Sequence, residues 1–305
     1  MLVEHDGYTA HRLHAGELEA VFVPSVGMIG ASLRHRGEEL LGQRAGLDAY
    51  ATRGKTMGIP LLHPWANRLS ADEYEVDGIR VTIPAEAPHL RREENGLPIH
   101  GLLAANPHWR VEHADDQNLE ATFDYPGRDE TLRALFPFAH ELRVEVRIAP
   151  HTLSITTRLT PTAPQPVPVA FGWHPYFQLP GVPRNEWELE LPARRHLHTD
   201  DNGIPTGETT EEPANRSRLD QTTYDDGYDD LAQPTTFALH APGRSITATF
   251  DQGYPAAQVF APPGQDLVAI EPMTAPTSAL TTHRGLVLAT RDEPYAARFT
   301  IRVDG

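Results

Sequence analysis

Apolar and polar residues alternate along several stretches of the chain. The alternation is clearest in four segments, 18–23, 142–148, 153–159 and 299–303. Successive side chains of a β-strand point to opposite faces of a sheet, so this pattern predicts antiparallel strands with one face on the core and one in water. Only the segment 37–51 predicts a helix or a helical turn.

Prolines and glycines are spread over the whole chain, 28 and 23 of them respectively, and leave few places for long helices. No strand, helix, strand rhythm occurs, which argues against a doubly wound or barrel α/β fold. We therefore expect an all-β protein, a large antiparallel β-sandwich. No composition shift marks a boundary, and the Pro-rich run 161–168 is expected to connect strands within a single domain spanning 1–305.

Charge and hydropathy indicate which kinds of molecule the protein can bind. The formal net charge of −16 opposes binding to nucleic acid or to an anionic membrane, since both require clustered positive charge. A neutral small molecule fits this composition better. No apolar run approaches the roughly 20 residues that span a bilayer, and the N-terminus lacks the layout of a signal peptide, so we expect a cytoplasmic protein.

Several reaction classes lack the residues they need. The chain has no cysteine, which excludes thiolate nucleophiles and thiolate metal sites, and no Gly-x-Ser-x-Gly elbow. Schiff-base chemistry would depend on Lys55, the only lysine. His196 and His198 share a strand face with Asp200 and Asp201 following, but no further residue completes a ligand set. We expect no metal.

The segment 171–177, Phe-Gly-Trp-His-Pro-Tyr-Phe, places His174 among aromatic rings. A pyranose has apolar C–H faces that pack against rings, and a ring oxygen that a histidine can protonate near neutral pH. The segment therefore predicts a sugar site, with Trp173 and Tyr176 beside the ring. The alternative is a histidine that is packed in the core.

Glu271 follows the apolar residues 268–270 and precedes Pro272. Partial desolvation at this point would raise the carboxyl pKa and make Glu271 a better base near neutral pH. A proline follows both Glu271 and His174, and each proline denies a donor to the sheet. We expect both side chains where strand pairing stops and a cleft begins. The alternative for Glu271 is a solvated strand end.

Two loops offer further polar groups. The apolar loop 58–69 delivers Asn67 and Arg68, which suit sugar hydroxyls, unless the arginine only pins the loop. His100 lies in a turn between Gly96 and Gly101, where a backbone could approach a ligand closely, and the alternative is a surface histidine.

The chain resembles the aldose 1-epimerase, or galactose mutarotase-like, family in four motifs that occur in the same order: Asn67-Arg68, His100-Gly101, His174-Pro175-Tyr176-Phe177 and Glu271-Pro272. The segments 20–33 and 204–208 also match, so the resemblance covers nearly the whole chain. It implies a galactose mutarotase-like β-supersandwich with a sugar cleft across its concave face, and no cofactor.

By this resemblance, Glu271 is the general base that takes the proton of the anomeric hydroxyl, and His174 is the general acid that protonates the ring oxygen. Arg68 and His100 would hold and polarise the sugar. Mutarotation requires an acid and a base acting together on one ring, whereas a carboxylate pair would suggest glycoside hydrolysis. We expect Glu271 and His174 to lie about 5 to 8 Å apart, a span set by a ring bridging two hydrogen bonds.

The aspartate that grips sugar hydroxyls in this family falls within the segment 224–230. We assign Asp225 to this role. Asp226 and Asp229 are alternatives that need only a small shift.

Two departures from the family leave the substrate open. His100 is followed by Gly101-Leu102 and not by paired glycines, and Trp173 precedes His174 where a polar residue is frequent. A hexose 6-phosphate mutarotase is therefore an alternative, and Arg91, Arg92 or Arg128 would then meet the phosphate. A carbohydrate-binding protein without turnover is a second alternative, which the retention of both His174 and Glu271 disfavours.

Overall fold

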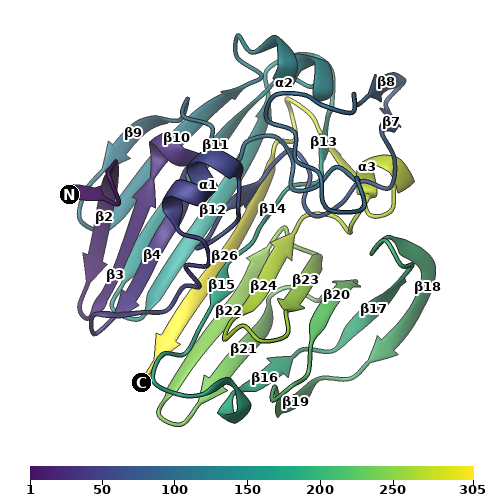
Figure 1. Cartoon of the computed structure of the whole chain (residues 1–305). Coiled ribbons are helices and arrows are strands. Elements are labelled where there is room, and N and C mark those ends of the chain that lie inside the picture. Colours follow the sequence, from purple (N-terminus) through teal and green to yellow (C-terminus); the bar gives the residue numbers. More distant parts are fainter.

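The structure of the protein is a computed structural model that describes residues 1–305. Antiparallel sheets make up most of the molecule (Figure 1). The largest has nine strands in the order β19 (Asn215–Arg218), β16 (Glu188–Leu191), β21 (Thr235–Ala241), β22 (Arg244–Gln252), β26 (Tyr295–Asp304), β12 (Thr152–Pro161), β11 (His140–Ala149), β10 (Asn118–Tyr125) and β9 (Arg110–Ala114).

An eight-stranded sheet carries the candidate site. Its order is β18 (Pro205–Glu212), β17 (Arg194–Thr199), β20 (Tyr224–Asp229), β23 (Ala256–Ala261), β24 (Val268–Met273), β14 (Gly172–Trp173) and β6 (Leu61–Leu62), and β15 (Tyr176–Phe177) also pairs with β24. A five-stranded N-terminal sheet contains β1 (Leu2–His5), β2 (Tyr8–Ala15), β3 (Leu18–Val23), β4 (Ile29–His35) and β5 (Glu38–Glu39).

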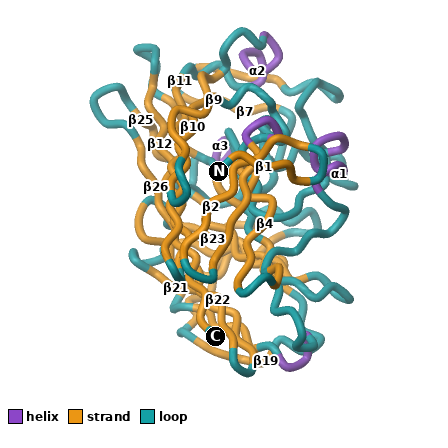
Figure 2. Tube along the Cα trace, turned by 90° about the vertical axis from the view of Figure 1, so that its left-hand side faces the viewer, coloured by secondary structure: helices purple, strands orange, loops and turns teal.

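The remaining elements are short. Two small sheets pair β7 (Glu73–Val76) with β8 (Ile79–Thr82), and β13 (Val167–Val169) with β25 (Val287–Ala289). The α-helices are α1 (Leu47–Arg53), α2 (Glu130–Leu135) and α3 (Ala279–Thr282), and 3₁₀ turns cover Pro24–Val26 and Arg184–Glu186. Figure 2 shows α1 and α2 at the periphery of a body made of strands. None of the helices is long and apolar enough to cross a membrane.

The four predicted strands are confirmed, because the segments 18–23, 142–148, 153–159 and 299–303 lie in β3, β11, β12 and β26. Buried and partly exposed residues alternate along β11 and β12, as the sequence pattern requires.

The helix expected at 37–51 is wrong over its first part, which contains β5. The helix α1 begins after Gly46 and ends before Gly54, and both glycines have a positive φ, of 84° and 66°. A backbone in this region favours glycine and stops a helix, so these two residues set its limits.

One hydrophobic cluster of 67 buried residues joins the sheets, and its members range from Leu13 to Val303. It includes side chains of the N-terminal, eight-stranded and nine-stranded sheets. The ring of Trp173 in β14, for example, lies 6.2 Å from that of Phe299 in β26. The all-β sandwich predicted from the sequence is therefore confirmed, with its core between the sheets.

Candidate active site

A pocket of about 190 Å³ contains seven of the eight site residues that the sequence predicted. Its lining residues are Arg44, Thr56, Asn67, Arg68, Ile99, His100, His174, Tyr176, Asp225, Phe260 and Glu271. The strands β20, β23, β24 and β15 supply Asp225, Phe260, Glu271 and Tyr176, and loops supply the rest. These strands lie next to one another in the eight-stranded sheet (Figure 1).

Strand pairing breaks on one side of Glu271. On that side, β14 pairs with Met273 and β15 pairs with Ala269 and Val268, so His174 and Pro175 lie at the interruption between them. This confirms the expectation for His174, because Pro175 has no N–H to offer β24. For Glu271 the expectation holds on this side only, since on the other side β24 continues through it and Glu271 pairs with Gln258 of β23.

His174 and Glu271 contact each other directly. Nε2 of His174 lies 3.1 Å from Oε1 of Glu271, which corrects the expected separation of 5 to 8 Å. Both side chains are buried, and neither His174 Nδ1 nor Glu271 Oε2 has a hydrogen-bond partner. Two buried polar atoms without partners in a pocket mark places where a ligand can bind.

Burial disfavours charge on both members of this pair. It raises the pKa of Glu271 well above its usual range, and nearby Asp225 adds to the rise while Arg68 opposes it. Burial likewise lowers the pKa of His174 well below its usual range, assisted by His100 and Arg44. Both shifts favour the uncharged pair, in which the carboxyl group of Glu271 keeps its proton and His174 is neutral.

His100 contacts His174 edge-on, with ring centroids 5.3 Å apart and planes at 78°. Burial first, and then Arg91, Arg68 and Arg44, lower the pKa of His100 to about 3. The imidazole is thus neutral at physiological pH, and its buried Nδ1 has no partner.

Gly101 serves a different purpose from the one expected. Its φ is 69°, and a Cβ at this position would overlap the backbone of His63. The glycine lets two protein segments approach each other, and no ligand contact with its backbone is shown.

Arg68 is held by several acceptors. Its Nε donates to both carboxylate oxygens of Glu93, at 2.9 and 2.7 Å, and its Nη1 donates to Asn67 at 3.1 Å. Its Nη2 lies 3.4 Å from Asp225, whose other oxygen accepts a hydrogen bond from Gln258 at 2.8 Å. The guanidinium is therefore fixed in the pocket and is not paired with a remote surface carboxylate.

Trp173 is the predicted site residue that lies elsewhere. It is fully buried, and its indole N–H donates to Thr157 of β12 at 3.0 Å. Side chains at successive extended positions point to opposite sides, so Trp173 faces the core while His174 and Tyr176 face the pocket. Trp65 is also buried outside the pocket. The aromatic walls of the pocket are Tyr176 and Phe260.

The alternative aspartates have other partners. Asp226 contacts His196 at 3.3 Å, and Asp229 pairs with Arg195 and Arg284. Asp225 is the aspartate that lines the pocket.

The arginines proposed for a phosphate are dispersed. Arg92 is tied to Asp72 and to backbone carbonyls, and Arg128 lines a different pocket. Arg91 lies over the ring of Tyr50 at 5.5 Å and does not line the pocket.

Six lining or supporting residues were missed by sequence reasoning: Arg44, Thr56, Glu93, Ile99, Gln258 and Phe260. Phe260 of β23 lines the pocket, and Gln258, two positions before it on the same face of the strand, donates to the lining residue Asp225. The other four lie in loops, which lack the alternation that marks one face of a strand.

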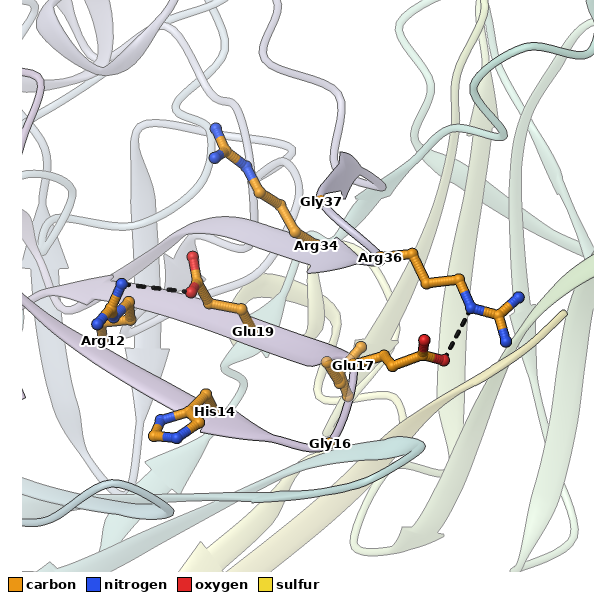
Figure 3. Close-up of a pocket in the computed structure, with 9 residues that line it drawn as sticks. Arg12, His14, Gly16, Glu17, Glu19, Arg34, Arg36 and Gly37 are labelled. Atoms are coloured by element: carbon orange, nitrogen blue, oxygen red, sulfur yellow. Dashed lines mark hydrogen bonds and ion pairs between the residues drawn. The ribbon is translucent and has the colours of Figure 1, made fainter.

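Another hollow, of about 390 Å³, lies on the N-terminal sheet (Figure 3). Its charged side chains are largely paired with each other, Arg36 with Glu17 at 2.8 Å and Arg12 with Glu19 at 3.6 Å. This hollow is larger than the site pocket, but no acid and base are buried in contact in it. The candidate site is therefore identified by its buried pair of titratable side chains and not by its volume.

Comparisons with known proteins agree with this picture. The chain is 22% identical over 259 residues to the uncharacterized protein YihR of Escherichia coli (strain K12), covering 80% of each chain.

Two solved structures have the same fold. A galactose mutarotase-like protein from Clostridium acetobutylicum matches with a TM-score of 0.85 and 16% identity, covering 100% of this chain and 98% of that one. A galactose 1-epimerase from Lactobacillus acidophilus NCFM matches with a TM-score of 0.76 and 13% identity, covering 99% and 96%. The fold is thus a galactose mutarotase-like β-sandwich. Because the model of the aldose 1-epimerase family also matches residues 10–302, the chain belongs to the aldose 1-epimerase family.

Proposed function

We propose that this protein is a mutarotase that interconverts the α and β anomers of a hexose. The observation that carries the proposal is the buried contact of 3.1 Å between His174 Nε2 and Glu271 Oε1, in a pocket whose polar lining residues suit sugar hydroxyls. Glu271 takes the proton from O1 while His174 gives a proton to O5, and the C1–O5 bond opens. C1 then turns about C1–C2, and the ring recloses on the other face of the aldehyde.

The short separation of acid and base suits this reaction. O1 and O5 are both bonded to C1, so two groups in contact can each reach one of these atoms without spanning the ring. The reaction needs one carboxylate and one protonated imidazole, which together hold the same single proton as the uncharged pair. Moving that proton from Glu271 to His174 across the 3.1 Å contact gives the active form.

Polarimetry tests the proposal directly. Freshly dissolved α-glucose and α-galactose should approach equilibrium rotation faster with the protein than without it, in proportion to protein concentration. A carbohydrate-binding protein without turnover would bind these sugars and leave the rate at the buffer value, which would contradict the proposal.

Glu93→Gln is expected to raise the KM for the sugar about 10-fold while kcat changes less. Glu93 holds Arg68 through two short hydrogen bonds, and the amide removes the charge that supports them. Arg68 would then lose its fixed direction in the pocket. Initial rates over a range of sugar concentrations measure this split. Glu188→Gln, which weakens a similar pair with Arg216 outside the pocket, should leave both constants unchanged. A fall in kcat alone would contradict this role.

A hexose 6-phosphate is the second candidate substrate, and one feature favours it. A pocket of about 380 Å³ is lined by Arg44, Ala45, Lys55, Thr56 and Gln265, and it shares Arg44 and Thr56 with the site pocket. No carboxylate lines it, so its two cations are available to an anionic group beside the bound sugar.

On this second candidate, Lys55→Met is expected to lower kcat/KM for glucose 6-phosphate about 10-fold and to leave that for glucose unchanged. The exposed ammonium would contribute one charge-assisted contact to the phosphate. Arg53→Met is the matched control, because it removes an exposed cation that does not line the pocket. If Lys55→Met has the same kcat/KM as the wild type for glucose 6-phosphate as well as for glucose, a phosphate subsite at Lys55 is excluded.

A further inference from the structure

The hydroxyl of Tyr176 is a junction between the catalytic histidine and two loop residues. Nη1 of Arg44 donates to it at 2.8 Å, Oγ1 of Thr56 lies 2.7 Å away, and Nε2 of His174 lies 3.1 Å away. The tyrosine ring also stacks on His174, with centroids 4.2 Å apart and planes at 21°. Tyr176 is buried, and the ring face that stacks on the imidazole of His174 cannot also pack against a sugar.

The direction of these hydrogen bonds follows from what each group can do. A guanidinium only donates, so the phenol oxygen accepts from Arg44. Burial raises the pKa of Tyr176 to about 12, and the phenol keeps its proton at physiological pH. That single proton is directed either to Thr56 or to His174, and either hydroxyl of the Thr56 and Tyr176 pair can be the donor.

Both directions correspond to a state of His174. When His174 has given its proton to O5, Glu271 holds the proton taken from O1 toward the sugar, and the lone pair of Nε2 is free. Thr56 then donates to Tyr176 and the phenol proton points to Nε2. When Nε2 carries a proton, the phenol donates to Thr56 and offers a lone pair toward Nε2–H. In the proposed reaction, His174 gives its proton to O5 during opening and takes it back during closure, so it passes through both states in each turnover.

We propose that Tyr176 and Thr56 form a reversible hydroxyl pair that positions His174 in both of its protonation states, while Arg44 fixes the phenol oxygen. The inference rests on the proposed function, because it assigns the general acid to His174. Tyr176 and Thr56 are positioning residues that act through His174.

Other charged and titratable groups also face His174. Glu271 of β24 lies at 3.1 Å from Nε2, the ring of His100 lies at 5.3 Å, and Arg44 lies beyond Tyr176. Phe260 of β23 adds an apolar edge at 6.3 Å. The pair of hydroxyls of Tyr176 and Thr56 differs from these neighbours because the direction of its hydrogen bonds can reverse while neither residue changes its charge.

Thr56→Val is the sharpest test. Valine has the shape of threonine but neither donates nor accepts, so the phenol proton is left with Nε2 as its only acceptor. This favours the neutral imidazole, and His174 should therefore lose its proton at a pH about 0.5 to 1 unit lower than in the wild type. NMR of the imidazole nitrogens measures this shift without any substrate. The rate profile should show the same shift on its alkaline side.

Tyr176→Phe keeps the stacked ring and removes the junction. The kcat of mutarotation should fall about 10-fold, with the KM of the sugar changing less than about 2-fold, because the lost group acts on the acid and not on the sugar. Tyr254→Phe is the matched control, since it removes a fully buried hydroxyl in the core and should leave kcat, KM and the His174 signals unchanged.

Wild-type kcat together with wild-type titration of His174 in both variants would overturn the inference. An upward shift in Thr56→Val would do the same, because it would mean that the phenol does not donate to Nε2. If Glu271→Gln and His174→Asn also turn over at the wild-type rate, the proposed function itself has failed. Loss of activity in those two variants with no effect of Thr56→Val and Tyr176→Phe would remove only the inference.

Discussion

Glu271→Gln is expected to lower the rate of mutarotation by about 10²-fold or more, because glutamine keeps the shape of the side chain but cannot take the O1 proton. Its carbonyl oxygen still accepts a hydrogen bond from Nε2 of His174, which in the wild type lies 3.1 Å from Oε1. The pocket should therefore keep its geometry. Polarimetry of α-glucose and α-galactose measures the rate, and sugar binding followed by calorimetry should change far less.

The chain supplies a matched control for this substitution. Glu190 forms a second His and Glu pair, with Nε2 of His240 at 2.8 Å, on the nine-stranded sheet and outside the pocket. Glu190→Gln makes the same chemical change there and should leave the rate unaltered. A Glu271→Gln variant as active as Glu190→Gln would mean that another group is the base.

The pH dependence follows from the shared proton. Burial raises the pKa of Glu271 and lowers that of His174, so the active pair carries one proton and the wild-type rate should be bell-shaped. At pH values on the acid side of the profile, both groups are protonated and no base remains. At pH values on the alkaline side, the pair has lost its last proton and no acid remains. Glu271→Gln removes the first of these steps, and the residual rate should no longer fall on the acid side.

Local signals in the sequence predicted the strands and the two residues in contact in the pocket, His174 and Glu271. The alternation in 142–148 and 153–159 depends only on neighbouring residues, and both segments became paired strands. His174 and Glu271 were recognisable because each precedes a proline within an apolar or aromatic segment. Such patterns depend on the backbone of one segment, so they can be recognised without knowing which other segment packs or pairs with it.

The support around the acid and base depends on contacts between distant segments. Arg44 and Tyr176 are 132 positions apart, and Glu93 and Arg68 are 25 positions apart. The register of β23 and β24 places Gln258 opposite Glu271. No single segment reports such a register. The separation of acid and base was misjudged for a chemical reason, since O1 and O5 share one carbon and do not require a gap the width of the sugar.

His174→Asn is expected to lower the mutarotation rate by about 10²-fold or more, because the amide offers a hydrogen bond but cannot protonate O5. The residual rate should no longer fall on the alkaline side, the opposite change from Glu271→Gln. His240→Asn is the matched control, since it alters the pair with Glu190 outside the pocket and should leave the rate unchanged.

Combining Glu271→Gln and His174→Asn then tests whether the two residues act as a unit. The C1–O5 bond opens only when proton removal and proton donation occur together. The loss of either group should therefore already remove most of the rate enhancement that the two groups provide together. The double variant should therefore be about as slow as the slower single variant. A double variant slower by the product of the two single effects would mean that Glu271 and His174 contribute independently, which would contradict proton removal and proton donation that occur together.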